Sequence, residues 1–179
     1  MNNDIEQVLY TQAQIDHRMD EIASQLTDKY QDQCPLIVSV MTGAVVFTVE
    51  MIKRLKFKLN LDYVDVSSYA DGTQSAGKVK LVQDLSSNIE GRPVIIMEDI
   101  IDTGHTLKYL ADLLKGRGAK SIEICALLDK PDRREVDVEA DYVGFKVPNE
   151  FIVGYGLDYS GLYRNLPYIG ILKRSVYEN

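Results

Sequence analysis

Three acidic residues and a hydroxyl-rich turn follow a strongly apolar stretch near the middle of the chain. Residues 94–97 are Val-Ile-Ile-Met, and Glu98, Asp99 and Asp102 come next, ahead of the turn 103–106, Thr-Gly-His-Thr. Small residues at the start of a helix present backbone N–H groups to an anion, above all to a phosphate. Carboxylates repel a bare phosphate, but they accept hydrogen bonds from a diol and bind divalent cations. The segment therefore predicts a site for a ribose 5-phosphate or for a phosphate with a metal ion.

The alternative is a solvated acidic turn in which Asp102 or Thr103 caps the helix. The density of acidic, hydroxyl and glycine residues favours a binding site. A second turn of this type, Met41-Thr42-Gly43, follows the apolar residues 36–40. By the same reasoning it is a candidate anion site for a second phosphate group, although many such turns are merely tight.

Candidate base-binding and metal-binding residues lie in the second half of the chain. Lys130 follows the predicted strand 122–128 and can donate a hydrogen bond to a ligand carbonyl. Phe151 can stack on a planar base. Asp158 can hold a metal ion directly or through water, and Arg164 can bind a phosphate oxygen. The alternative for this segment is an aromatic core with surface charges, and the acidic turn decides in favour of a site.

One long polar segment interrupts the apolar pattern. Residues 67–78 hold two Gly, three Ser and almost nothing to bury, so they predict a loop that acts as a lid or forms a disordered tip. Ser68 and Tyr69, at its root, can close over the pocket. A mobile surface loop without that role is an equally good interpretation.

The elements that must position these residues alternate between strands and helices. Periodicity predicts helices over 11–30, 44–55 and 106–115, with Thr11 as an N-cap. It predicts strands over 36–41, 59–66, 79–82, 94–97, 122–128, 142–145, 151–153 and 168–172. Fully apolar strands between helices indicate an α/β fold, a mainly parallel central sheet with helices on both faces. The N-terminal helix and the C-terminal strands fit that alternation poorly, so they are expected to form a small lobe.

Composition and missing motifs exclude several classes of protein. The formal net charge of −7 disfavours nucleic acid and anionic membranes as partners. The nucleotide triphosphatase loop is absent, and Gly154-Tyr155-Gly156 lacks the third glycine of a dinucleotide fingerprint. Signalling receiver domains place their acid pair after the first strand, whereas here it follows roughly the fourth. Two cysteines, no signal-like N-terminus and no long apolar run predict a cytoplasmic location.

The motifs together resemble a known family. Residues 94–107 resemble the signature of the type I phosphoribosyltransferases, enzymes that bind 5-phosphoribosyl 1-pyrophosphate. The segments 127–131, 151–159 and 163–170 resemble the 6-oxopurine branch of that family. This resemblance implies one domain over 1–179, with a hood formed by the N-terminal segment and about 145–179. It also implies a mobile loop at about 67–78.

The resemblance implies a role for each candidate residue. Glu98 and Asp99 would bind the ribose hydroxyls near Mg²⁺, Asp102 would be the acid/base at the purine N7, and Thr103, Gly104, His105 and Thr106 would cradle the 5-phosphate. Met41, Thr42, Gly43 and Arg164 would bind pyrophosphate, the first three often through a cis non-proline peptide, and Ser68 and Tyr69 would form the lid. Lys130, Phe151 and the Ile152 backbone would bind the purine, and Asp158 would bind a second Mg²⁺. Many relatives carry Lys or Arg where this chain has Thr42, so the role of that side chain cannot be carried over.

The implied reaction is phosphoribosyl transfer from phosphoribosyl pyrophosphate to N9 of hypoxanthine, and of guanine. The products are IMP or GMP and pyrophosphate, with Mg²⁺ as cofactor. Two alternatives stay open, a regulator that senses phosphoribosyl pyrophosphate and a xanthine-preferring transferase. The partners expected are these small molecules and further copies of the chain, as a homodimer or homotetramer, with no nucleic acid and no membrane.

Overall fold

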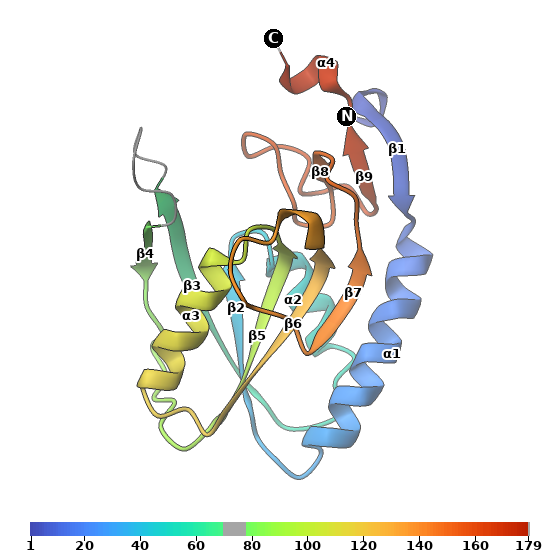
Figure 1. Ribbon diagram of the computed structural model, residues 1–179. Helices are drawn as coiled ribbons and strands as arrows, with labels where there is room; N and C mark the ends of the chain where they lie inside the picture. The colour runs from blue at the N-terminus through green and yellow to red at the C-terminus, as the bar shows by residue number, and fades with distance from the viewer. Residues whose placement is uncertain (70–77, 179) are drawn as a thin grey trace.

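The main feature of the computed structural model, which describes residues 1–69 and 78–178, is a six-stranded sheet (Figure 1). In spatial order its strands are β4 (Lys78–Gln83), β3 (Asn60–Tyr69), β2 (Leu36–Met41), β5 (Pro93–Ile101), β6 (Ser121–Asp129) and β7 (Tyr142–Lys146). Strands β3, β2, β5, β6 and β7 are parallel, while β4 at one edge is antiparallel to β3. The carboxyl ends of the parallel strands therefore meet at one edge of the sheet, where ligands bind in folds of this type.

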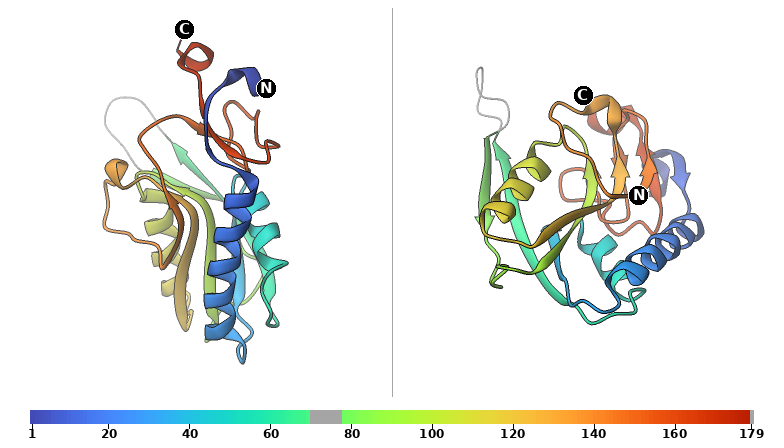
Figure 2. Two further views of the ribbon diagram at one scale, coloured as in Figure 1. Left: turned by 90° about the vertical axis from the view of Figure 1, so that its right-hand side faces the viewer. Right: turned by 60° about the horizontal axis from the view of Figure 1, so that its bottom comes forward.

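Helices cover both faces of this sheet (Figure 2). The helices α1 (Gln12–Tyr30) and α2 (Val45–Ile52) pack on one face, and α3 (His105–Gly116) packs on the other. Thr11 caps α1 as predicted, since its hydroxyl accepts from the Gln14 backbone and the Gln14 side chain accepts from the Thr11 backbone. None of the helices in the described ranges combines the length and the apolar composition that crossing a bilayer requires.

A second, smaller sheet joins the two ends of the chain. Its strands are β1 (Ile5–Tyr10), β9 (Ile169–Leu172) and β8 (Ile152–Val153), flanked by η1 (Asn2–Asp4) and α4 (Arg174–Tyr177). They enclose a core of Val153, Leu166 and Leu172. The prediction of a mainly parallel α/β sheet with a small lobe from both chain ends is confirmed, but the N-terminal helix expected in that lobe packs on the large sheet instead. Strand β1 was not predicted, because its three central residues are exposed and break the apolar pattern.

Two predicted boundaries are wrong because pairing with a neighbour extends the strand. Strand β5 continues from the predicted 94–97 to Ile101, since Ile100 and Ile101 pair with residues of β6. Strand β3 continues past Val66 to Tyr69, against β4, so the predicted loop 67–78 begins and ends in strand. Residues 70–77 lie outside the described residues, so the mobility predicted for them stays a prediction.

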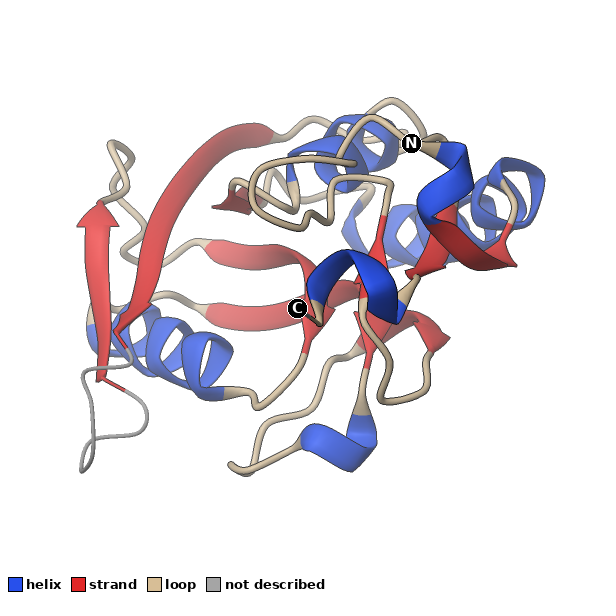
Figure 3. Cartoon of the chain, turned by 90° about the horizontal axis from the view of Figure 1, so that it is seen from above, coloured by secondary structure: helices blue, strands red, loops and turns tan. Residues whose placement is uncertain are grey.

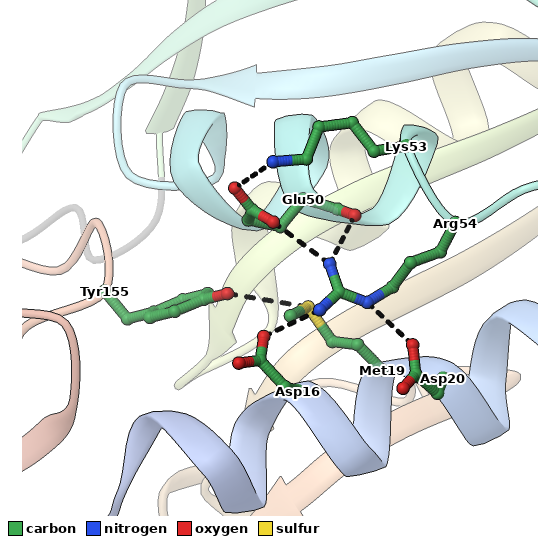
Figure 4. A network of polar contacts seen from close by, with 7 residues as sticks. All are labelled: Asp16, Met19, Asp20, Glu50, Lys53, Arg54 and Tyr155. Carbon is green, nitrogen blue, oxygen red and sulfur yellow. Dashed lines mark hydrogen bonds and ion pairs between the residues drawn. The ribbon is translucent and has the colours of Figure 1, made fainter.

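One cation joins the two helices that share a face of the sheet (Figure 4). From the end of α2, the Arg54 guanidinium donates to Asp16 at 2.7 Å and to Asp20 at 2.9 Å on α1, and to the Glu50 carboxylate at 3.0 Å. Beside it, the Tyr155 hydroxyl, from the loop after β8, donates to Met19 Sδ at 3.8 Å. Arg54 is 19% exposed, so its charge is largely removed from water and depends on these carboxylates.

We predict that Arg54→Ala lowers the free energy of unfolding by about 1–3 kcal/mol. Removing one partner of a fully buried ion pair costs about 3–5 kcal/mol, and the exposure of Asp16 and Asp20 reduces that figure here. Urea unfolding measures the change. Lys53→Ala, which removes an exposed ion pair to Glu50, is the matched control and should cost less than about 1 kcal/mol. Equal losses in the two variants would contradict the role of Arg54.

Candidate active site

Two adjacent carboxylates, Glu98 buried and Asp99 partly buried, stand near the end of β5. Glu98 is 9% exposed, and its Oε2 is a buried oxygen with no hydrogen-bond partner among the described residues. Burial raises the pKa of the Glu98 carboxyl well above its ordinary value, and the charge of Asp99 adds to the rise. Burial likewise raises the pKa of Asp99, although its Oδ1 accepts from the Ile100 backbone at 2.7 Å. Such groups are suited to accept a hydroxyl hydrogen bond or to meet a cation.

The turn after β5 leads directly into α3. Gly104 is the N-cap, with φ at 90°, and a Cβ there would lie 2.6 Å from a Val138 methyl, so only glycine fits. Asp102 and Thr103 therefore do not cap the helix. The His105 ring turns aside to Glu135, with 2.9 Å between Nε2 and Oε2. A small cavity of about 90 Å³ lies at this turn, and its lining includes five predicted residues, Glu98, Asp102, Thr103, Gly104 and Thr106.

The turn after β2 touches the acid pair. The peptide bond between Met41 and Thr42 is cis, as the resemblance implies. A Cβ on Gly43 would lie 1.6 Å from Asp99 Oδ2, so the bare glycine lets the carboxylate lie against the backbone. On its other side the Gly43 carbonyl meets Gly156, where a Cβ would approach its oxygen to 2.2 Å. The segments around Gly43, Asp99 and Gly156 are therefore packed in direct contact.

A larger cavity of about 530 Å³ opens beside Asp99. Six predicted residues line it, namely Asp99, Asp102, Lys130, Phe151, Ile152 and Asp158. Arg133, on the short helix η2 (Pro131–Arg133), donates from Nε to Asp102 Oδ1 at 3.0 Å. Burial lowers the pKa of Lys130, whose Nζ donates to the Glu150 carbonyl at 2.8 Å. A cation, a carboxylate and an aromatic ring thus face one space.

Asp158 and Arg164 form an ion pair at the rim of this cavity. Arg164 Nη2 lies 2.8 Å from Asp158 Oδ1, and Arg164 Nη1 donates to the Gly156 carbonyl at 2.6 Å. The second carboxylate oxygen of Asp158 accepts from the Gly161 backbone at 2.6 Å. Arg164 also lowers the pKa of Asp99 against the effect of burial. Arg164 therefore offsets much of the charge of Asp158 before any ligand binds.

The arrangement supports part of the predicted site directly. The predicted residues at the carboxyl edge of the sheet are the turns 41–43 and 102–106, the acid pair, Asp158 and Arg164. Of these, the residues that line neither cavity are Met41, Thr42, Gly43, His105 and Arg164. The backbone of Ser68 and Tyr69 ends β3, but their side chains are not described, so their role stays a prediction. Cavity residues that the sequence analysis did not select are Ile100, Arg133, Asn149, Glu150, Leu157, Arg174, Tyr177 and Glu178. Arg133 follows Lys130 closely and was detectable as a second cation at that strand end.

The donors suit Mg²⁺ when a ligand completes its coordination. Within residues 1–69 and 78–178, no three Asp, Glu, His or Cys side chains are grouped as a metal site. Mg²⁺ commonly uses one or two carboxylates together with substrate oxygens and water. Asp99 and Asp158 beside one cavity, with the unpartnered oxygen of Glu98 close behind, fit that pattern.

Comparison with known proteins identifies the family. A model described as "Phosphoribosyl transferase domain" matches residues 7–160. A hypoxanthine-guanine phosphoribosyltransferase of Bacillus subtilis is 51% identical over 179 residues, covering 100% of this chain and 99% of the relative. A bifunctional protein TilS/HprT of Listeria monocytogenes is 52% identical over 99% of this chain, which spans 27% of the length of that relative.

Solved structures agree with the sequence relatives. A crystal structure of a hypoxanthine phosphoribosyltransferase from Staphylococcus aureus matches with a TM-score of 0.96 at 50% identity, covering 100% of this chain and 97% of that one. The family model thus matches most of the chain, and the relative from Bacillus subtilis matches all of it. The chain belongs to the phosphoribosyltransferase family, in the branch of the hypoxanthine-guanine phosphoribosyltransferases.

Proposed function

We propose that the chain is a purine-salvage transferase that moves the 5-phosphoribosyl group from phosphoribosyl pyrophosphate to N9 of hypoxanthine or guanine. The products are IMP or GMP and pyrophosphate. One observation carries the proposal: Lys130, Phe151 and Asp102 line the same cavity as Asp99 of the acid pair. A purine in that cavity would adjoin a ribose phosphate held at the neighbouring turn.

The 5-phosphate of the ribose would lie at the smaller cavity. It would lie at the start of α3, where the backbone of Thr103, Gly104, His105 and Thr106 supplies N–H groups and the helix dipole is positive. Glu98 and Asp99 would accept hydrogen bonds from the ribose hydroxyls, which satisfies the unpartnered oxygen of Glu98. Pyrophosphate would take the turn Met41-Thr42-Gly43 and Arg164.

The purine would bind in the larger cavity, which offers it matching partners. Lys130 would leave the Glu150 carbonyl to donate to the 6-oxo group, with Phe151 against the ring and the Ile152 backbone at its edge. Asp102 would take or share the N7 proton as the bond from N9 to the ribose forms. Cleavage of the bond to pyrophosphate leaves positive charge on the ribose, as in glycoside cleavage. The carboxylates near the end of β5 would favour that charge electrostatically.

Mg²⁺ belongs to the proposal as a cofactor. Asp99 and Asp158 would hold it together with oxygens of the sugar and of pyrophosphate. When bound, it would neutralise the negative charge that develops on the leaving pyrophosphate. The pairing of Asp158 with Arg164 keeps that carboxylate in position before any metal ion binds. A homodimer or homotetramer and a cytoplasmic location stay predictions.

A turnover assay with a panel of purines tests the proposal. Protein, Mg²⁺ and phosphoribosyl pyrophosphate are mixed separately with hypoxanthine, guanine, xanthine and adenine, and nucleotide formation is followed by absorbance. We expect rapid turnover of hypoxanthine or guanine that is lost on removal of Mg²⁺. Turnover of xanthine alone would favour the xanthine-preferring alternative. Binding of phosphoribosyl pyrophosphate without turnover of any purine would contradict the transferase and favour a sensor.

We predict that Lys130→Ala raises the KM for hypoxanthine by about 10- to 100-fold, with little effect on the KM for phosphoribosyl pyrophosphate. A hydrogen bond from a charged donor contributes about 1.5–3 kcal/mol, which corresponds to this range. Steady-state kinetics with each substrate varied measures the split. Lys120→Ala is the matched control, because Lys120 is an exposed lysine at the opposite end of β6. An unchanged KM for the purine would remove Lys130 from base recognition.

A further inference from the structure

The C-terminal helix α4 forms part of the wall of the larger cavity. Seen from above in Figure 3, α4 lies beside the C label over the middle of the molecule. Arg174 and Tyr177 on the helix, and Glu178 just after it, line the cavity. The backbone of Lys173, immediately before α4, donates to the Asp4 carbonyl at 2.9 Å, and Val176 packs on the core of the small sheet. The helix is therefore attached to the hood, and Tyr177 is its aromatic contribution to the cavity.

Three aromatic rings meet at this wall. The rings of Phe151 and Tyr177 have centroids 5.0 Å apart and planes 31° apart. The ring of Tyr159 meets Phe151 edge-on, at 5.3 Å and 88°. A third ring stacked between two others needs about 7 Å between them, since carbon atoms in contact are about 3.5 Å apart. No purine fits between Phe151 and Tyr177, so a base on Phe151 must use the side that Tyr177 leaves open.

The orientation of the Phe151 ring is set by these neighbours. Phe151 is only partly buried, so the apolar core does not hold it on all sides. Tyr177 packs against it at a shallow angle and Tyr159 packs against it nearly at a right angle, which together limit rotation of the ring. The plane of Phe151 in turn sets the plane of a stacked base and the direction of its 6-oxo group toward Lys130. Small errors in such an orientation weaken binding markedly.

We propose that Tyr177 is a positioning residue of the base site, which holds Phe151 at the angle on which a 6-oxopurine stacks. The proposal rests on the proposed function and adds to it a residue outside the motifs of the sequence. Tyr177 acts through the face of its ring, so its hydroxyl is dispensable. Asp102, the proposed acid/base, is on another element, so the effect is on base binding and not on the chemical step.

Steady-state kinetics of Tyr177→Ala and Tyr177→Phe test this role. We expect Tyr177→Ala to raise the KM for hypoxanthine or guanine by about 2- to 10-fold, the range that an aromatic pair supplies. The KM for phosphoribosyl pyrophosphate and kcat should change less than about 2-fold by the same reasoning. Tyr177→Phe should behave as the wild type. Tyr168→Ala is the control, because Tyr168 packs on the same core but does not line the cavity.

The other outcomes overturn the proposal. A lower KM for the purine in Tyr177→Ala would show that the ring obstructs the base, and a rise of both KM values together would show a general structural defect. If Tyr177→Ala fails to fold, Tyr177→Trp provides a second test, because it introduces a single tryptophan into a chain that has none. The fluorescence emission of this tryptophan should change when IMP is added but not when inorganic phosphate is added. An emission that does not respond to IMP would contradict the placement of Tyr177 at the base site.

The failure of this proposal and of the proposed function are distinguishable. If the wild type turns over no 6-oxopurine, the function itself is wrong. If the wild type is active and Tyr177→Ala has the same KM for the purine, the positioning role alone is wrong.

Discussion

Asp102→Asn should lower kcat by about 10²- to 10⁴-fold, the range that a positioned general acid or base contributes. Asp102 lines both cavities, so it stands between the proposed phosphate turn and the proposed base site. An amide keeps the size of the side chain and its acceptor oxygen for Arg133, but it cannot take the N7 proton. Binding of phosphoribosyl pyrophosphate should therefore stay within a few-fold of the wild type. Rapid-mixing kinetics and equilibrium binding measure the two quantities separately.

The control for this experiment is Asp132→Asn. Asp132 lies next to Arg133 on η2, is exposed and lines neither cavity, so the same change of charge there should leave turnover unaffected. If Asp102→Asn retained turnover within a few-fold of the wild type, Asp102 would not be the acid/base. A parallel loss of binding and turnover would instead assign Asp102 to substrate affinity.

The turn of residues 102–106 was predictable because its chemistry is local. Glycine, small hydroxyl residues and a helical pattern following an apolar strand occur within a few positions, and each constrains the backbone without help from distant residues. The end of β5 was not predictable on the same grounds. Glu98 and Asp99 have the composition of a loop, and only pairing with β6 keeps them in strand. Glu98 is buried as a consequence, which a loop would not have required.

Residues joined only by tertiary contact gave no signal in the sequence. Tyr177 reaches Phe151 because β9 pairs with β8 and carries α4 over the cavity, and nothing near Tyr177 in the chain indicates that route. Strand β1 was missed for a related reason, since its backbone pairing with β9 does not need an alternating apolar face. Strand pairing therefore determines the positions of β1 and α4, which the periodicity of the sequence could not predict.

Gly43→Ala should lower kcat/KM by about 10²-fold or more and lower the free energy of unfolding by about 1–3 kcal/mol. The added methyl would occupy the position of Asp99 Oδ2, at 1.6 Å, and the carboxylate would have to move away from the turn. Asp99 is partly buried and lines the larger cavity, so its carboxylate would be displaced toward that cavity. The displacement would disturb the proposed pyrophosphate and ribose sites together. Turnover assays and urea unfolding measure the two losses.

A matched control and a double mutant separate this clash from a general cost of alanine. Gly116→Ala makes the same change at the end of α3, where no atom lies within 4 Å of the added methyl, and it should leave turnover unchanged. In an Asp99→Ala background the oxygen that meets the methyl is gone, so Gly43→Ala should cost little further stability. The coupling between the two positions, measured by the double-mutant cycle, then equals most of the single-mutant loss. Additive losses would mean that the contact with Asp99 does not explain why a glycine stands there.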